Sequence, residues 1–262
     1  MKPFRSSDTA KERPGGKGRI PLRKLVPNMI TLLALCAGLT AVRLAFEGRF
    51  QEATVFILLA AFLDGVDGRV ARLLRSASRF GAELDSLTDF VNFGVAPAVI
   101  LYAWGLNELT SVGWIGVLIY AICAALRLAR FNVALEDPNK PKWTANYFVG
   151  IPAPAGACTA LLPLYLDFLG LPRFEITGGA VLVYVLLIGF LMASSVPTFS
   201  GKLVGPQVDR AWVMPLFVVF VLFLGLLASF PWSVLTACTL LYFAMIPVSI
   251  MRYRRNARLR SG

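Results

Sequence analysis

The stretch DGVDGRVARLLRSASRFGAELDSLTD, residues 64–89, places four aspartates inside strongly apolar sequence. They are Asp64, Asp67, Asp85 and Asp89, at spacings of three, eighteen and four residues, with arginines between the two pairs. The flanking segments ATVFILLAAFL and FVNFGVAPAVILYAW carry no charged residue. Burying charge in apolar surroundings requires a compensating partner. This stretch is therefore informative about the fold and is the first candidate for a functional site.

The composition indicates a polytopic membrane protein. Of 262 residues, 57% are hydrophobic and 16% are charged, whereas about a quarter are charged in an average soluble domain. We expect eight helical spans, since a span needs about 20 mostly apolar residues. They lie roughly at residues 27–47, 51–74, 84–105, 111–132, 150–170, 178–197, 211–230 and 232–251. The predicted fold is therefore an all-α, compact bundle of about eight transmembrane helices with short loops.

The basic residues predict the orientation of this bundle. With a cytoplasmic N-terminus, eight spans return the C-terminus to the cytoplasm, and 23 of the 26 Lys and Arg residues then lie on that side, as the positive-inside rule requires. We expect a disordered basic tail over residues 1–19, a single transmembrane domain over 20–251 and a basic tail over 252–262. Basic residues next to spans attract anionic lipid, so we expect membrane lipid and no nucleic acid as a partner.

Helical periodicity brings the aspartates onto facing surfaces. Asp64 and Asp67 share one face of the second span, and Asp85 and Asp89 stack on one face of the third. The polar segment 76–81 between these spans predicts a tight turn. Two antiparallel helices joined there would bring the two acidic faces together.

Four carboxylates near one end of a bundle repel each other unless a cation neutralises them. Arginines of the same stretch are one source of positive charge, and a metal ion is the other. The chain has no histidine, and its four cysteines match no zinc spacing, so the pattern favours an all-oxygen site for Mg²⁺, Mn²⁺ or Ca²⁺. Small residues beside the acids favour a bound ligand, with close helix packing as the alternative. These are Gly65, Gly68, Ala71, Gly81 and Ala82.

The same stretch fits the pattern D-x₂-D-G-x₂-A-R-x₈-G-x₃-D-x₃-D, and in this it resembles the CDP-alcohol phosphatidyltransferases. The pattern is filled by Asp64, Asp67, Gly68, Ala71, Arg72, Gly81, Asp85 and Asp89. The segments DSLTDFVNFGVAPA, ALRLARFN and YFVGIPAPAGA resemble the phosphatidylserine synthase branch of the family. Asn92 stands where relatives often have serine, and both side chains form hydrogen bonds.

The resemblance implies transfer of the phosphatidyl group from CDP-diacylglycerol to L-serine, with release of CMP. It implies that Mg²⁺ or Mn²⁺ binds Asp64, Asp67, Asp85 and Asp89, and that Asp89 also takes the proton of the attacking hydroxyl. Contacts to the CDP-lipid are implied for Asp64, Gly68, Ala71, Arg72 and Gly81. It further implies a homodimer in the bacterial inner membrane, with the active site facing the cytoplasm.

The acceptor site is less defined by the motif. Arg127 and Arg130 are the candidate partners for the carboxylate of serine, and Asn92 and Asn132 are candidate polar contacts, although both arginines could serve topology alone. The motif also leaves open another acceptor, namely glycerol 3-phosphate, inositol phosphate or choline. A cation transporter is the alternative of a different class, but its acids would lie on several distant helices.

Overall fold

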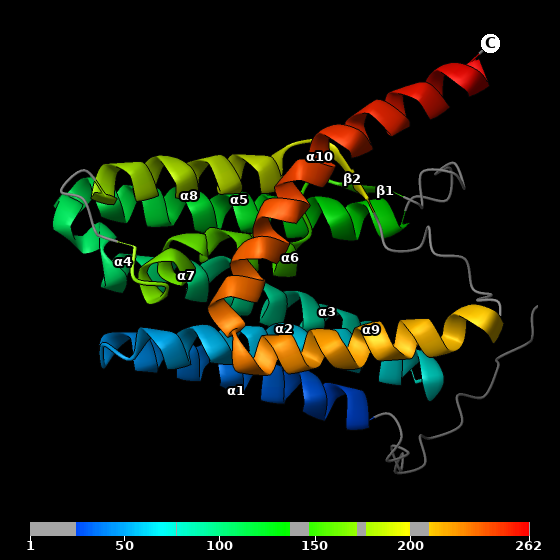
Figure 1. Ribbon diagram of the computed structural model, residues 1–262, viewed down its shortest axis with the longest axis horizontal. Helices are drawn as coiled ribbons and strands as arrows, with labels where there is room; N and C mark the ends of the chain where they lie inside the picture. Colours follow the sequence, from blue (N-terminus) through cyan, green and yellow to red (C-terminus); the bar gives the residue numbers. More distant parts are fainter. Residues whose placement is uncertain (1–24, 77, 137–146, 172–176, 200–209, 262) are drawn as a thin grey trace, which may run out of the picture.

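The computed structural model describes residues 25–76, 78–136, 147–171, 177–199 and 210–261. The predicted tail over residues 1–19 lies outside this part of the chain. Within it, the fold is a helical bundle with one small two-stranded sheet (Figure 1). The elements are α1 (Leu25–Phe46), α2 (Phe50–Leu73), α3 (Arg79–Asp89), the π-helix η2 (Phe90–Val95), α4 (Ala96–Trp104), the 3₁₀ helix η3 (Leu106–Leu109), α5 (Thr110–Glu136), β1 (Tyr147–Val149), α6 (Ala153–Ala160), α7 (Leu162–Phe168), α8 (Thr177–Ala193), β2 (Pro197–Phe199), α9 (Arg210–Ser229) and α10 (Pro231–Ser261).

Five helical segments of the described chain are long and apolar enough to cross a membrane, which fits an integral membrane protein. They are Leu25–Phe46, Arg79–Trp104, Leu106–Ala134, Trp212–Ser229 and Pro231–Arg252. The predicted spans 51–74 and 178–197 also coincide with helices, α2 and α8, although α2 carries two of the aspartates and α8 has only 17 residues. The apolar pattern thus located each of these helices to within a few residues.

The predicted span 150–170 is not one helix. It is divided into α6 and α7, which meet at Leu161. Pro163 has no N–H and cannot continue the hydrogen-bond ladder to the carbonyl of Thr159. That carbonyl accepts a backbone N–H at the C-cap of α6 and also the hydroxyl of Tyr184 of α8, at an O–O distance of 2.6 Å. The proline therefore explains why a uniformly apolar segment forms two short helices.

The bundle has two helix pairs with a packed interior between them. In Figure 1, α1 and α2 run together along one edge, α5 and α8 along the opposite edge, and α4, α6 and α7 lie between them. The interior contains the largest fully buried side chains of the described chain, among them Phe93, Tyr120, Leu164 and Tyr165. Strands β1 and β2 pair antiparallel, with Tyr147 opposite Phe199, and this pairing has no counterpart in the sequence-based expectations.

The C-terminal helices are arranged differently. The described side chains of α9 are exposed along almost its whole length, and its main neighbour is α10. Helix α10 crosses the bundle in Figure 1, contacting α7 and β2. It continues to Ser261, so the segment predicted as a tail, residues 252–262, is helical up to that residue.

A break between the second and third spans is confirmed, but residues 79–81, predicted to belong to the turn, are the first residues of α3. Helix α2 ends at Leu73 and α3 begins at Arg79. The hydroxyl of Ser78 accepts the backbone N–H of Gly81 at 3.0 Å, which satisfies one of the free donors at the start of α3. The two helices that carry the aspartates are therefore joined by a short connection into a hairpin, in which α3 packs against α1 (Figure 1).

We predict that Gly113→Ala destabilises the fold. A Cβ at Gly113, in the first turns of α5, would lie 1.9 Å from the carbonyl oxygen of Leu106. Relieving such overlap costs about 1–3 kcal/mol, which thermal unfolding of the purified protein should record as a melting temperature lower by several degrees. Gly105→Ala is the control, because nothing lies within 4 Å of its added Cβ. Equal melting temperatures for the two variants would contradict the close approach of η3 to α5.

Candidate functional site

The hairpin of α2 and α3 brings three carboxylates together. Asp64 and Asp67 lie one turn apart on α2, and Asp85 lies on α3. Each offers a carboxylate oxygen, and these three oxygens all lie within 4.8 Å of one another. Asp67 is buried, and the other two are half-buried. A cluster of this size and chemistry can hold a divalent cation that prefers oxygen ligands.

Asp89 extends this acid cluster further along α3. Its carboxyl group lies within hydrogen-bonding distance of that of Asp64. Its Oδ1 is buried and has no hydrogen-bond partner in the described chain. Two carboxylates at this separation repel each other strongly when both are ionised. A shared proton or a bound cation is therefore required between them.

Thr31 of α1 joins the cluster from a third helix. Its hydroxyl bonds to Oδ2 of Asp67 at 2.6 Å, which fixes the orientation of that carboxylate. Thr31 is not among the residues that the sequence pattern singles out. Its signal is its place on the buried face of α1, where it continues the series Ala34, Gly38 and Ala41 at helical spacing.

Arg127 of α5 brings a positive charge to the acids. Its side chain interacts electrostatically with Asp64 and Asp89, and only 8% of the residue is exposed. The guanidinium carbon lies 5.4 Å from the ring centroid of Phe131, and Nε has no hydrogen-bond partner among the described residues. A buried guanidinium with an unused donor is suited to bind an anionic ligand beside the carboxylates.

Arg130 serves a different neighbour. Its Nη1 donates to the carbonyl of Ser194 at 3.3 Å, and its Nη2 donates to the carbonyl of Ala193 at 2.5 Å. Both carbonyls lie at the C-terminal end of α8, where an arginine compensates carbonyl groups that have no partner in the helix. Of the two arginines that the sequence offers for the acceptor, the structure thus brings Arg127 to the acids and ties Arg130 to α8.

The two candidate asparagines also differ in their surroundings. Asn132 donates from Nδ2 to Oγ of Ser86, next to Asp85, at 2.9 Å. Asn92 is fully buried, and neither its Oδ1 nor its Nδ2 has a partner in the part of the chain that the structure describes. It lies against α1, where a Cβ at Gly38 would meet its Oδ1 at 2.0 Å. Asn132 therefore connects α5 to α3 beside the acids. Asn92 instead occupies a space that is open because residue 38 of α1 is glycine.

The small residues of the motif fall into two groups. Nothing lies within 4 Å of a Cβ added at Gly68, so this side of α2 is open beside the acids. Gly81 is enclosed, because an added Cβ would lie 3.0 Å from Oδ1 of Asn28. Ala71 is half-buried. The exposed Arg72 folds back and donates from Nε to the carbonyl of Gly68 at 3.0 Å.

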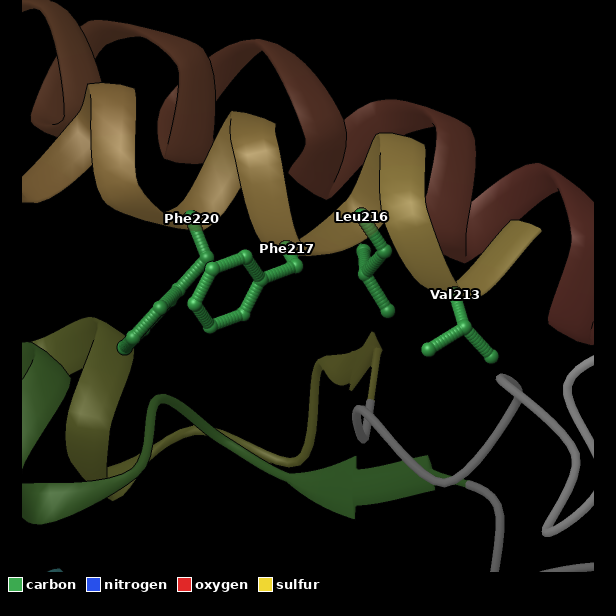
Figure 2. A pocket seen from close by; sticks show the side chains of 4 residues that line it. All are labelled: Val213, Leu216, Phe217 and Phe220. Atoms are coloured by element: carbon green, nitrogen blue, oxygen red, sulfur yellow. The ribbon is translucent and has the colours of Figure 1, made fainter.

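An apolar pocket of about 480 Å³ lies beside α9. It is lined by Val213, Leu216, Phe217 and Phe220, whose side chains all point to the same side of the helix (Figure 2). Such a lining offers contact to hydrocarbon and no group for chemistry. The reactive groups therefore belong to the acid cluster.

Comparison with known proteins agrees with this chemistry. The family described as CDP-alcohol phosphatidyltransferase matches residues 24–196, and the one described as CDP-alcohol phosphatidyltransferase 2 matches residues 211–247. Several relatives carry the name CDP-diacylglycerol–serine O-phosphatidyltransferase, and three of them illustrate the range of similarity. The relative from Mycobacterium tuberculosis is 36% identical over 242 residues, covering 92% of this chain and 83% of the relative. That from Helicobacter pylori is 33% identical over 224 residues, covering 83% and 87%. That from Mycobacterium leprae is 52% identical over 158 residues, covering 60% of this chain and 52%, about half, of the relative.

We predict that Asp85→Asn weakens divalent-cation binding. The change removes the ligand charge that α3 contributes to the three-carboxylate group. Removing a group that only orients a metal ligand lowers the metal affinity of a site by about 10–100-fold. Removing a ligand itself should therefore lower the Mn²⁺ affinity by at least about tenfold. Calorimetric or spin-resonance titration of the purified protein measures it.

Glu83→Gln is the matched control for this measurement. Glu83 lies on the same helix and is exposed. Its substitution by glutamine therefore removes the same charge without changing the cluster. Equal Mn²⁺ affinity in both variants would exclude a cation at the three carboxylates.

Proposed function

Because this chain belongs to the CDP-alcohol phosphatidyltransferase family, we propose that it transfers the phosphatidyl group of CDP-diacylglycerol to L-serine, giving phosphatidylserine and CMP. The observation that carries the proposal is the acid cluster, in which oxygens of Asp64, Asp67 and Asp85 lie within 4.8 Å of one another. The names of the three relatives support serine as the acceptor.

The proposed topology has eight spans, with both termini in the cytoplasm. It adds α2, α8 and the pair α6–α7 to the five long apolar segments. Arginines at positions 69, 72, 75 and 79 surround the turn between α2 and α3, which supports a cytoplasmic position for that turn. The acid cluster would then face the cytoplasm from a bacterial inner membrane. A homodimer is part of the proposal on the strength of the family resemblance.

The donor set fits a hard divalent metal. Asp64, Asp67, Asp85 and Asp89 would hold Mg²⁺ or Mn²⁺, since all four offer oxygen, the chain has no histidine, and the group of three found among the described residues contains no cysteine. When bound, such an ion stabilises negative charge on the diphosphate of the substrate. The hydroxyl of Thr31 holds Asp67 in place for this task through its 2.6 Å hydrogen bond.

Asp89 is the proposed general base. Its Oδ1 is buried and has no partner within the described residues, so it can accept the proton of the serine hydroxyl. The serine oxygen then forms a bond to the phosphorus of the phosphatidyl group, and the bond from that phosphorus to the oxygen of CMP breaks. Burial of the carboxylate keeps water from competing with the serine hydroxyl.

The CDP-lipid is proposed to lie along α2 and the start of α3. The open side at Gly68 gives it room beside Asp64. Arg72 is exposed next to that opening, and its planar guanidinium suits a phosphate group. Ala71 and Gly81 are the remaining small residues proposed to contact the CDP-lipid. Gly81 has less free space, because Asn28 lies against it.

Arg127 is the proposed partner of the serine carboxylate. Its burial beside Asp64 and Asp89 supports this choice, whereas Arg130 is bound to the carbonyls at the end of α8. Asn92 and Asn132 are proposed as secondary polar contacts. Asn132 is the closer to α3, through its hydrogen bond to Ser86.

We predict that Asp89→Asn abolishes most serine-dependent CMP release. General-base catalysis contributes about 10²–10⁴-fold to a rate, so turnover should fall by roughly that factor, while binding of the CDP-lipid is only weakened. The assay supplies serine, glycerol 3-phosphate, inositol phosphate and choline separately with CDP-diacylglycerol. Turnover by the variant at the wild-type rate would exclude Asp89 as the base. Consumption of a different acceptor would refute the choice of serine and leave the role of Asp89 intact.

We predict that Arg127→Gln removes the preference for an acceptor with a carboxylate. A hydrogen bond to a charged group is worth about 1.5–3 kcal/mol, or roughly 10–100-fold in affinity. The KM for serine should rise by about that factor, with the KM for CDP-diacylglycerol little changed. Serinol, which lacks the carboxylate, serves as the comparison. If the ratio of serine to serinol turnover is the same in wild type and variant, Arg127 does not bind the carboxylate.

A further inference from the structure

The π-helix η2, which directly follows Asp89, has a local cause in the sequence. In a regular α-helix the N–H of residue 97 would bond to the carbonyl of Phe93. Pro97 has no N–H, and its ring would clash with that carbonyl. The helix widens just before the proline into η2, where the N–H of Ala96 bonds to the carbonyl of Val91, five residues back. The π-turn is therefore how this helix accommodates Pro97.

Tyr120 of α5 bonds to the carbonyl that the proline leaves free. Its hydroxyl donates to the carbonyl oxygen of Phe93 at 3.2 Å, and both residues are completely buried. A carbonyl without a partner in an apolar interior is costly, and membrane helices recover such groups through side chains of neighbouring helices. The hydroxyl of Tyr120 thus stabilises the π-turn against rearrangement.

The π-turn is also held sterically from two sides. A Cβ at Gly94 would lie 3.0 Å from Cβ of Ala124, one turn after Tyr120 on α5. On the other side Asn92 fills the space above Gly38 of α1. Inserting one residue into a helix rotates the preceding part by about 100° relative to the following part. Because α4 is fixed in the core, the π-turn sets the direction in which the carboxylates of α3 point.

A second tyrosine hydroxyl bonds to a carbonyl near a proline at a distance from the acids. Pro163 cannot donate to the carbonyl of Thr159, which accepts a backbone N–H at the C-cap of α6 and the hydroxyl of Tyr184 at 2.6 Å. This second pair lies between α6 and α8 and does not touch α3. It therefore supplies a control with the same chemistry.

We propose that Tyr120 is a positioning residue for Asp89: its hydroxyl, by holding the carbonyl of Phe93, fixes the π-turn that points Asp89 toward the carboxylates of α2. The inference rests on the role proposed above for Asp89. Tyr120 itself touches neither the acids nor the substrate. It acts only through the backbone of η2.

Tyr120→Phe tests this proposal, because it removes the hydroxyl and keeps the ring. A misplacement of about 1 Å at a reacting group can lower a rate about 100-fold, so we expect kcat for CMP release to fall by about 10–100-fold. The KM for CDP-diacylglycerol and the melting temperature should change no more than in Tyr184→Phe. Equal kcat in the two variants would overturn the proposal.

A double variant separates positioning from general loosening. If Tyr120 acts through Asp89, adding Tyr120→Phe to Asp89→Asn should cause little further loss, because the group being positioned is already gone. If the loss of kcat in the double variant equals the product of the losses in the two single variants, the proposal is overturned. Wild-type turnover in Asp89→Asn alone would instead overturn the proposed base, so the two failures are distinguishable.

Pro97→Ala tests the turn without removing any hydroxyl. It restores the N–H that a regular helix needs, and a regular helix would give up the hydrogen bond of Tyr120 and the packing of Asn92 that hold the π-turn. We expect turnover to fall as in Tyr120→Phe, because a regular helix would rotate Asp89 away from α2. This variant decides the question even if Tyr120→Phe does not fold. Full turnover in Pro97→Ala would overturn the proposal.

Discussion

The structure depends on keeping four carboxylates together inside an apolar bundle. Separately, each would be driven toward water, and together they repel one another. Two groups from neighbouring helices compensate them: the hydroxyl of Thr31 of α1 on Asp67, and the guanidinium of Arg127 of α5 near Asp64 and Asp89. The geometry of the carboxylate oxygens also suits a divalent cation. The acids thereby tie the α2–α3 hairpin to helices on both sides of it.

A second constraint concerns the backbone. Prolines inside apolar helices leave carbonyl groups without donors, and lipid offers no water to satisfy them. At Phe93 and at Thr159 a tyrosine hydroxyl from a neighbouring helix donates to the carbonyl, and at Thr159 a backbone N–H at the C-cap of α6 donates as well. These bonds do more than satisfy polar groups, because each fixes an irregular turn that would otherwise have several conformations. In the first case the irregular turn directly follows Asp89. The way in which the backbone accommodates Pro97 of α4 therefore sets the direction of the Asp89 side chain.

The sequence was sufficient for the helices and the core of the site, because both depend on periodicity. The spacing of the aspartates predicted the meeting of Asp64, Asp67 and Asp85, and this is confirmed. Contacts that depend on how distant helices dock were not predictable in this way. Thr31 acquires its role only because α1 lies along α2. Arg127 and Arg130, three residues apart on α5, differ because one faces the acids and the other the end of α8. The break between α6 and α7 was signalled by Pro163 but obscured by uniformly apolar sequence.

The acid cluster comes from a single hairpin, residues 64–89, whereas Arg127 follows much later in the chain. During synthesis the hairpin is therefore made, and its carboxylates meet, before α5 exists. At that stage the hairpin lacks the guanidinium of α5, so its own arginines, protons or dissolved cations must offset the charge of the carboxylates. The order of the chain thus delivers the buried guanidinium only after the carboxylates that it accompanies have been made.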